Sequence, residues 1–351
     1  VLRLALSGQL GKDAFTSDAM ADAMALCVGC KACKSECPMS IDMAKMKTEV
    51  QAARVKANGP SLRDRAIAVL PRLAPLASKI APLSNFALKG ASLVGLGGGR
   101  SLPAFQARYK GAADGNVLLF ADTFNCHFNP DTLAAAERVI ARSGRKVGVL
   151  SVAGRPLCCG RTYLSSGMPD KATSEMRRTT DAFRAALEAG KTIVGLEPSC
   201  TLMFRDEAVN LIPEWTEDMG ARILTFAEYI AQNPPQGITL KGQEFLVHGH
   251  CHQKAMGVAA ATVDALNAID GASARMIESS CCGMAGAFGY QPETQDVSRQ
   301  MAELSLAPAV RAAPPSTRIV ADGFSCRCQI GDVTERKADS LAVVLDWAMS
   351  Q

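Results

Sequence analysis

From residue 115 onward, short apolar runs alternate with longer stretches in which apolar residues recur at helical spacing. Three apolar runs with turn residues at their ends are predicted to be strands: 117–122, 146–152 and 192–197. Helical spacing between them is found at Leu133 and Ile140, and at Met176, Phe183 and Leu187. Strands that alternate with helices predict βαβ units and therefore a parallel sheet.

The same order of elements then occurs a second time. Strands are predicted over 244–248, 274–278 and 317–322, and a closing helix over 340–349. The cysteines repeat at nearly the same distance: Cys126 and Cys251 are 125 positions apart, Cys159 and Cys282 are 123 apart, and Cys200 and Cys326 are 126 apart. Three landmarks with nearly one offset predict a duplicated α/β domain, with copies over 113–236 and 237–351.

The first 62 residues are predicted to be helical around a loop that carries Cys27, Cys30, Cys33 and Cys37. Because this spacing is similar to that of bacterial ferredoxins, we expect an α-helical ferredoxin-like domain over 1–62. Ser40 is the expected cap of a helix that ends at 58–60 and has one apolar face, made by Met43, Met46, Val50 and Ala53. Because Val1 is not an initiator methionine and begins an apolar stretch without a cap, we expect the chain to be a piece of a longer protein.

Residues 63–112 are predicted to form a helical linker. The stretch 66–98 is strongly apolar, but prolines, lysines and an arginine interrupt it, and no uninterrupted apolar run reaches the roughly 20 residues that a spanning helix needs. We therefore expect short helices and no transmembrane segment. A surface peripheral to a membrane or to a partner stays open as an alternative. The glycines of 95–99 predict a flexible exit before Pro103.

Composition narrows the possible functions. The chain has 351 residues, 48% of them hydrophobic, enough for two or three domains with sizeable cores. A net charge of +4 and 5% aromatic residues do not give the clustered basic surface with stacking rings that a nucleic-acid partner requires. Thirteen cysteines without a secretion signal indicate a reducing compartment, with the cytoplasm as the expected location, and metal or redox chemistry in place of disulfides.

Four cysteines lie close together near the N-terminus. Cys27, Cys30, Cys33 and Cys37 precede Pro38 in the C-x2-C-x2-C-x3-C-P spacing that holds a [4Fe-4S] cluster in bacterial ferredoxins. In two-cluster ferredoxins the fourth cysteine of such a run binds the other cluster, so Cys37 is expected to diverge from the other three, with a companion run upstream. A structural zinc knuckle is the alternative, although zinc prefers two C-x2-4-C pairs separated by a longer arm.

Each copy of the duplicated domain carries cysteines where its predicted strands end. Because the carboxyl ends of adjacent parallel strands meet at one crevice, these thiols are expected to form metal sites, and the glycine of each Cys-Cys-Gly triplet lets the backbone approach a bulky cluster. The expected ligands are Cys158, Cys159, Cys200, Cys251, Cys281, Cys282 and Cys326. Cys126 and Cys328 are left open between metal binding and burial as small apolar residues.

The duplicated Cys…Cys-Cys-Gly…Cys pattern resembles the CCG domains found in the cysteine-rich chain of heterodisulfide reductase and in glycolate oxidase iron–sulfur proteins. The whole chain is similar to the C-terminal half of large FAD-linked D-2-hydroxyacid dehydrogenases, through the runs 27–38, 42–47, 197–200, 248–254, 281–290 and 322–327. In that family a flavin domain oxidises a D-2-hydroxyacid such as D-lactate or D-2-hydroxyglutarate, and the iron–sulfur half takes the electrons. The resemblance implies a FAD-binding dehydrogenase domain or subunit as the partner.

The chain departs from the five-cysteine CCG pattern, which ends in C-x2-C. Glu197 and Gly323 stand where the first cysteine of that pair falls in the two copies, so a five-thiolate cluster is not expected in either. Glu197 offers an oxygen ligand, and His250 and His252 offer ring nitrogens, a mixed donor set that suits iron or zinc. Each histidine has ordinary hydrogen bonding as its alternative role. Further cations are expected to offset thiolate charge: Arg161, Lys254 and Arg327.

These motifs leave two redox functions and one structural role as hypotheses. The first is the electron-transfer part of a flavin-linked D-2-hydroxyacid dehydrogenase, which passes electrons from reduced flavin through a [4Fe-4S] cluster to a quinone or another electron carrier. The second is a thiol–disulfide catalyst like heterodisulfide reductase, against which the missing C-x2-C cysteines argue. A zinc-stabilised scaffold without redox chemistry is the third hypothesis. No segment has the glycine-rich loop of a βαβ nucleotide site, so FAD is expected outside these residues.

Overall fold

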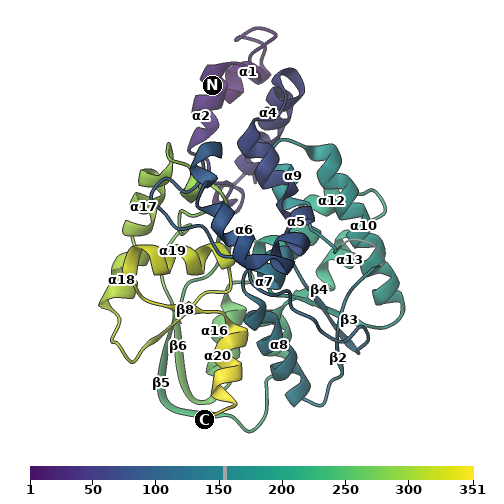
Figure 1. The fold of residues 1–351 in the computed structure, drawn as a ribbon, viewed down its shortest axis with the longest axis vertical. Coiled ribbons are helices and arrows are strands. Elements are labelled where there is room, and N and C mark those ends of the chain that lie inside the picture. Colours follow the sequence, from purple (N-terminus) through teal and green to yellow (C-terminus); the bar gives the residue numbers. More distant parts are fainter. Residues whose placement is uncertain (153–155) are drawn as a thin grey trace.

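The computed structural model describes residues 1–152 and 156–351. Figure 1 shows an N-terminal group of helices at one end of the molecule and two α/β units side by side below it, with the α5–α6 segment between them. This arrangement confirms the predicted α/β class with a helical N-terminal region. The boundaries predicted between the domains stay predictions.

The N-terminal region is built from four helices around a small apolar core of its own. They are α1 (Leu2–Leu6), α2 (Asp18–Ala25), α3 (Ala32–Glu36) and α4 (Met43–Asn58). The predicted cap of α4 was wrong by two residues: Ser40 has a φ of 51°, and Asp42 caps the helix by accepting the Lys45 N–H through Oδ1 at 3.1 Å. A carboxylate at this position also interacts favourably with the positive, N-terminal end of the helix dipole.

The linker contains a longer helix than its prolines predict. α5 (Leu62–Lys79) runs through Pro71 and Pro75, and α6 (Ala81–Leu88) and the 3-10 helix η1 (Ala91–Val94) follow it. Pro71 lies on the buried face of α5, with Ala68, Ala74 and Ser78. Packing of this face against α7 and α9 outweighs the local cost of the prolines. Within the described residues, no helix has both the length and the apolar character needed to cross a bilayer.

Two four-stranded sheets form the centre of the α/β units, and every strand pair in them is parallel. The first has the order β2-β1-β3-β4, from β1 (Val117–Phe120), β2 (Val147–Val149), β3 (Thr192–Gly195) and β4 (Ile223–Thr225). The second has the order β6-β5-β7-β8, from β5 (Thr239–Val247), β6 (Asp270–Met276), β7 (Arg318–Val320) and β8 (Ala338–Asp339). The identical order is what the predicted duplication requires.

Helices cover both sheets. The first unit contains α7 (Thr123–His127), α8 (Pro130–Arg142), α9 (Arg161–Ser165), α10 (Pro169–Glu188), α11 (Pro198–Thr201), η2 (Leu202–Arg205), α12 (Glu207–Leu211), α13 (Glu217–Ala221) and α14 (Phe226–Gln232). The second contains α15 (Cys251–Ala255), α16 (Ala260–Asn267), η3 (Phe288–Tyr290), α17 (Gln295–Glu303), α18 (Leu306–Ala312), α19 (Phe324–Thr334) and α20 (Leu341–Ala348).

The two units share one hydrophobic core. α8 packs against α20 and α14 against α16, and buried side chains of both units join the same cluster, among them Leu133, Tyr229, Leu266 and Leu345. At its rim, Arg138 donates two hydrogen bonds to Asp346, at 2.7 and 2.6 Å. This shared core fixes the two sheets relative to each other, and so fixes the loops at their carboxyl ends.

Candidate functional site

The ferredoxin-like run forms a loop in which three thiols lie near one another. Burial raises the pKa of the Cys30 thiol, the Ala32 N–H lowers it, and the nearby thiols of Cys251, Cys27 and Cys33 raise it again. Cys33 Sγ accepts a hydrogen bond from the first N–H of α4, that of Met43, at 3.3 Å. Backbone donors to sulfur are among the features that set the potential of an iron–sulfur cluster.

Cys37 has different surroundings. The backbone N–H groups of Ile41, Met39 and Ser40 lower the pKa of its thiol. Its divergence from the other three cysteines and its role as a ligand of a second cluster stay predictions.

The first α/β unit gathers three buried thiols. Cys158 and Cys159 hydrogen-bond to each other, and Cys159 hydrogen-bonds to Cys200. The bond from Cys159 lowers the pKa of Cys200, but burial and the nearby carboxylates of Asp122 and Glu197 outweigh it and raise that pKa to about 11. A metal ion that binds these thiols must displace their protons.

The second α/β unit gathers four thiols. Hydrogen bonds join Cys251 to Cys281, Cys281 to Cys282, and Cys282 to Cys326 in a continuous chain. All but Cys251 are fully buried. The cysteines predicted as CCG ligands thus lie in two groups, one at the carboxyl end of each sheet.

The glycine of each Cys-Cys-Gly triplet has a specific backbone role. Gly160 and Gly283 have φ of +81° and +90°, and their N–H groups donate to Cys158 Sγ and Cys281 Sγ, both at 3.4 Å. A Cβ would lie 2.7 Å from Ala172 O at Gly160 and 2.4 Å from Ser298 O at Gly283. Only glycine combines this left-handed backbone with such close packing.

The two cysteines left open by the sequence lie outside both groups. Cys126 is the fourth residue of α7, whereas Cys251 is the first residue of α15, so the predicted equivalence of these two cysteines was wrong. The Cys126 thiol packs in the shared core and hydrogen-bonds to Arg108. Cys328 hydrogen-bonds to Tyr290 at the wall of a small cavity.

The predicted non-sulfur ligands have protein partners. Glu197 accepts hydrogen bonds from Ser199 Oγ at 2.8 Å and from the Phe324 N–H of α19 at 2.7 Å, so it links the two units. His250 caps α15 by accepting the His252 N–H at Nδ1, at 3.1 Å. A Cβ at Gly323 would lie 2.5 Å from His250 Cδ2 and 3.0 Å from Cys326 Sγ, so a cysteine does not fit there without movement. Ligation by these residues stays a prediction.

Sequence reasoning missed His248, the residue that follows β5. Its ring lies near the thiols of Cys282 and Cys326. One possible ligand atom from each of these three residues lies within 4.8 Å of the other two. His248 is 1% exposed, and burial lowers its pKa to about 3, helped by Lys254 and His250. The sequence does contain an indication of this role, because His248 and Cys251 form a His-x2-Cys motif at the end of a strand.

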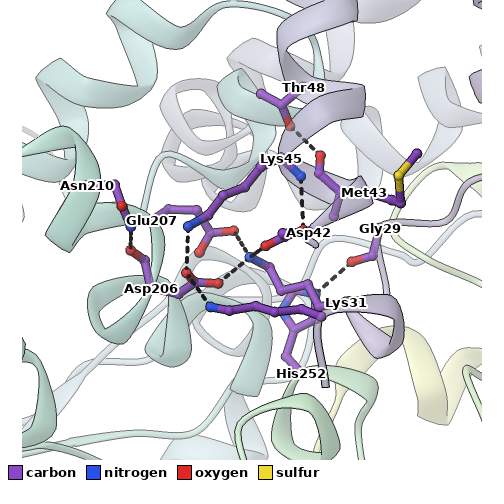
Figure 2. Close-up of polar contacts among 12 residues, drawn as sticks. Gly29, Lys31, Asp42, Met43, Lys45, Thr48, Asp206, Glu207, Asn210 and His252 are labelled. Carbon is purple, nitrogen blue, oxygen red and sulfur yellow. Dashed lines mark hydrogen bonds and ion pairs between the residues drawn. The ribbon is translucent and has the colours of Figure 1, made fainter. Parts of the chain in front are cut away.

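A buried cation anchors the ferredoxin-like loop to the first unit. Lys31, with a φ of 64° and 2% exposure, places Nζ against Asp206, 3.0 Å from Glu207 Oε1 and 3.5 Å from Asp42 Oδ2. Lys34 and Lys45 also reach Asp206, at 3.2 and 3.0 Å. Figure 2 shows Lys31 and Lys45 converging with the three carboxylates between the loop, α4 and α12. Burial would raise the pKa of Asp206, but Lys31 and Lys45 outweigh it and hold that pKa well below its usual range.

The same loop is tied to the second unit through His252. His252 Nε2 donates to Gly29 O at 3.1 Å (Figure 2), and Arg161 Nη2 donates to His252 Nδ1 at 3.4 Å. Arg161 also pairs with Glu207 Oε1 at 2.9 Å, the oxygen that Lys31 contacts. Contacts therefore form a closed ring through all three parts of the protein.

The three cations predicted to offset thiolate charge have different surroundings. Burial lowers the pKa of Arg161, but Glu207 and then the nearby thiols of Cys159 and Cys200 outweigh it and raise that pKa. Lys254 is placed near all four thiols of the second unit. Arg327 instead donates to the carbonyl oxygens of residues 321 and 322, at 3.0 and 2.6 Å, so it holds the end of β7 in place.

Comparison with known proteins agrees with the cysteine pattern. Residues 122–205 match the family described as the CCG cysteine-rich domain. The chain is 25% identical over 340 residues to the D-2-hydroxyglutarate dehydrogenase of Escherichia coli K12, covering 88% of this chain and 32% of that protein. The Pseudomonas putida KT2440 protein of the same name is 25% identical over 359 residues. The alignment covers 93% of this chain and 34% of that protein. One of the subunits of the E. coli K12 anaerobic glycerol-3-phosphate dehydrogenase is 25% identical over 258 residues, which cover 72% and 62%.

These similarities confirm the resemblance inferred from the cysteine motifs. The match to the CCG cysteine-rich domain covers residues 122–205, and the relatives are dehydrogenases by name, which supports an oxidoreductase role. It spans about a third of the length of the D-2-hydroxyglutarate dehydrogenases that it matches.

Replacing the triplet glycines tests the packing of the thiol loops. We expect Gly160→Ala and Gly283→Ala each to destabilise the fold by more than the about 1–2 kcal/mol that a left-handed backbone costs a non-glycine residue, because each Cβ also meets a carbonyl oxygen. Gly190→Ala is the control, since Gly190 has a φ of +71° and open space around it. Urea unfolding measures the difference, and equal losses in all three variants would refute the packing argument.

Removing the buried cation tests the anchor of the loop. We expect Lys31→Met to cost about 3 kcal/mol, because it removes the buried cation between Asp206 and Glu207 and leaves them only the more exposed Lys34 and Lys45, and Arg161. The control Lys34→Met removes a cation that is 39% exposed and should cost no more than about 1 kcal/mol. Urea unfolding curves of the two variants give the comparison.

The same network predicts a pH dependence. The pKa of Asp206 is depressed in the folded protein, so its stabilisation is present above the unfolded pKa of about 3.9 and is lost as the pH falls below it. In Lys31→Met this loss should be smaller and should be complete at a higher pH, since the folded pKa of Asp206 then lies closer to its unfolded value. An unchanged acid limb of the stability curve would contradict this assignment.

Proposed function

We propose that this chain, a CCG-domain protein homologous to FAD-linked dehydrogenases, transfers electrons from a reduced flavin to an acceptor. One observation carries the proposal: the loop with Cys27, Cys30 and Cys33 lies against α15, with Cys30 beside the thiol of Cys251. Two sets of soft donors, from distant parts of the sequence, therefore lie next to each other. This placement suits a redox path better than two independent structural sites.

The donor set fits an iron–sulfur cluster in the ferredoxin-like loop. Cys27, Cys30 and Cys33 supply sulfur, and the Met43 N–H already hydrogen-bonds to Cys33 Sγ. Lys47 donates to Cys27 O, and the cations of the Lys31 network surround the loop. A cluster bound here would take up and release one electron at a time. The residues around it hold the loop in one conformation and offset thiolate charge.

We propose that the flavin is held by a part of the protein, or a partner subunit, outside these 351 residues. The relatives named D-2-hydroxyglutarate dehydrogenase are about three times as long as the matched region, which leaves room for a flavin-binding part. The substrate oxidised at that flavin would be a D-2-hydroxyacid. The 351 residues alone would then not turn over substrate.

The thiol–disulfide alternative has less support. It depends on a five-cysteine CCG site, and the position of the fifth thiol is taken by Gly323 in the second unit, where His250 and Cys326 already occupy the space of a side chain. In the first unit, Glu197 holds this position and is hydrogen-bonded on both oxygens. Electron transfer is therefore the function that we propose.

The helical linker offers a surface for a membrane. Between residues 65 and 113 the sequence has seven lysines and arginines and no aspartate or glutamate. On α5 and α6 large apolar side chains are exposed beside Lys79 and Lys89: Leu73, Leu76, Leu83 and Phe86 are 54–68% exposed. Exposed apolar side chains beside cations are typical of helices that lie on anionic membranes. We propose that this face lies on such a membrane and that a membrane quinone is the acceptor.

Electron exit is tested in the longer protein that includes the flavin part. Replacing Cys30 with Ser should leave reduction of the flavin by a D-2-hydroxyacid nearly unchanged and slow electron transfer to an artificial acceptor at least about tenfold, because one cluster ligand is lost. Cys328→Ser, outside both thiol groups, is the control. Stopped-flow absorbance follows the two steps separately. Substrate turnover by the 351 residues alone, or full acceptor reduction by Cys30→Ser, would overturn the proposal.

Membrane binding is tested by co-sedimentation with vesicles. The protein should bind vesicles that contain phosphatidylglycerol and should not bind pure phosphatidylcholine. Reversing the charge at Lys79 and Lys89 together should weaken binding at least about tenfold, since each cation near an anionic surface contributes about 1 kcal/mol. Lys171→Glu with Lys241→Glu, also exposed but on the α/β units, is the matched control. Equal binding by both double variants would refute this surface.

A further inference from the structure

His248 has one ring nitrogen in use and one without a partner. Its backbone N–H donates to Val320 O at 2.8 Å, which fixes the residue at the end of β5. Nδ1 lies 3.0 Å from Ser279 Oγ, and Lys254 Nζ donates to the same oxygen at 3.3 Å. Nε2 is buried and has no hydrogen-bond partner among the described residues. A buried polar atom without a hydrogen-bond partner lowers the stability of the fold by about 1–3 kcal/mol. A ligand bound to this nitrogen would remove that cost.

The surroundings of the His248 ring are rich in sulfur. Donor atoms of His248, Cys282 and Cys326 all lie within 4.8 Å of one another. In a tetrahedral site with metal–sulfur distances near 2.3 Å and metal–nitrogen distances near 2.0 Å, ligand atoms lie roughly 3.5 Å apart. Small side-chain movements therefore bring the three atoms onto one ion. The hydrogen-bonded chain from Cys282 through Cys281 to Cys251 provides a further thiol beside them.

The hydrogen bonds of the ring suit this role. A histidine that binds a metal through one nitrogen usually donates its other N–H to an oxygen, which fixes the tautomer and the ring orientation. Ser279 Oγ can accept from both His248 Nδ1 and Lys254, because a hydroxyl oxygen has two acceptor positions. The lone pair of Nε2, which has no hydrogen-bond partner among the described residues, is then available to an ion.

The first unit lacks the same donors. Asp122 and His250 cap the equivalent helices α7 and α15, so Phe120 takes the place of His248 and Thr123 the place of Cys251. Phe120 packs edge-on against Phe183 and Phe204. Among the described residues, the first unit thus offers three thiols and no imidazole at the position of His248, whereas the second offers four thiols and an imidazole with a free nitrogen.

We propose that the second unit binds a single Zn2+ or Fe2+ ion through His248 Nε2, the thiolates of Cys282 and Cys326, and a fourth ligand from Cys281 or Cys251. A mixed sulfur and nitrogen set around one tetrahedral ion suits these two metals. The proposal concerns this site alone and does not depend on electron transfer through the ferredoxin-like loop.

Metal content of the full 351-residue chain tests the site. Chains grown with zinc and iron are analysed by mass spectrometry of metals, before and after His248→Ala. We expect His248→Ala to lose one ion per chain, or to bind it at least about tenfold more weakly in competition with a chelator. His127→Ala is the matched control, because His127 is equally buried and hydrogen-bonds to Ser78 at 2.9 Å. Unchanged metal content in His248→Ala would overturn the proposal.

Spectroscopy of the unmodified chain decides the case even if the alanine variant fails to fold. If the ion is zinc, X-ray absorption at the zinc edge should show a nitrogen shell near 2.0 Å beside sulfur near 2.3 Å. If it is iron, Mössbauer spectra should show one ferrous ion separate from cluster iron. An all-sulfur zinc shell, or iron present only as clusters with no zinc bound, would reject His248 as a ligand.

Discussion

The buried charge of Lys31 is the constraint on which the arrangement of the site depends. A cation with 2% exposure is stable only if anions surround it, and Asp42, Asp206 and Glu207 come from two separate segments. To reach them, Lys31 adopts a left-handed backbone, which costs about 1–2 kcal/mol for a non-glycine residue. The loop between Cys30 and Cys33 therefore has one position relative to the first unit. The same position brings Gly29 O to His252 in the second unit.

The two α/β units kept their framework and changed their donors. Sheet order, the Cys-Cys-Gly turn and its N–H to sulfur bond are the same in both. Phe120 and His248, at equivalent positions, are an aromatic core residue in one unit and a polar residue beside thiols in the other. Backbone geometry thus limits where thiols stand, and single side chains decide which donor atoms each unit offers beside them.

Much of the fold could be predicted because it repeats. Six of the eight strands in the described residues, and the equal spacing of the triplets, follow from apolar runs and cysteine positions. β4 and β8 were not predicted: β8 has only two residues, and β4 leads directly into α14 without a turn that would separate strand from helix. The prolines in 62–79 predict short helices, but α5 is continuous. Tertiary packing of its buried face outweighs the low helix propensity of these residues. His248 and Lys31 escaped prediction for another reason: their roles depend on partners that lie far away in the sequence.

The core shared by α8, α14, α16 and α20 also has a consequence for the origin of the chain. Each unit covers its helix face only with the equivalent face of the other, and Arg138 and Asp346 meet across that boundary. An ancestor with one unit would have exposed this apolar face to water. A two-fold symmetric homodimer is the arrangement that covers it. Fusion of the two genes would then have freed each half to evolve its own ligands while the other preserved the interface.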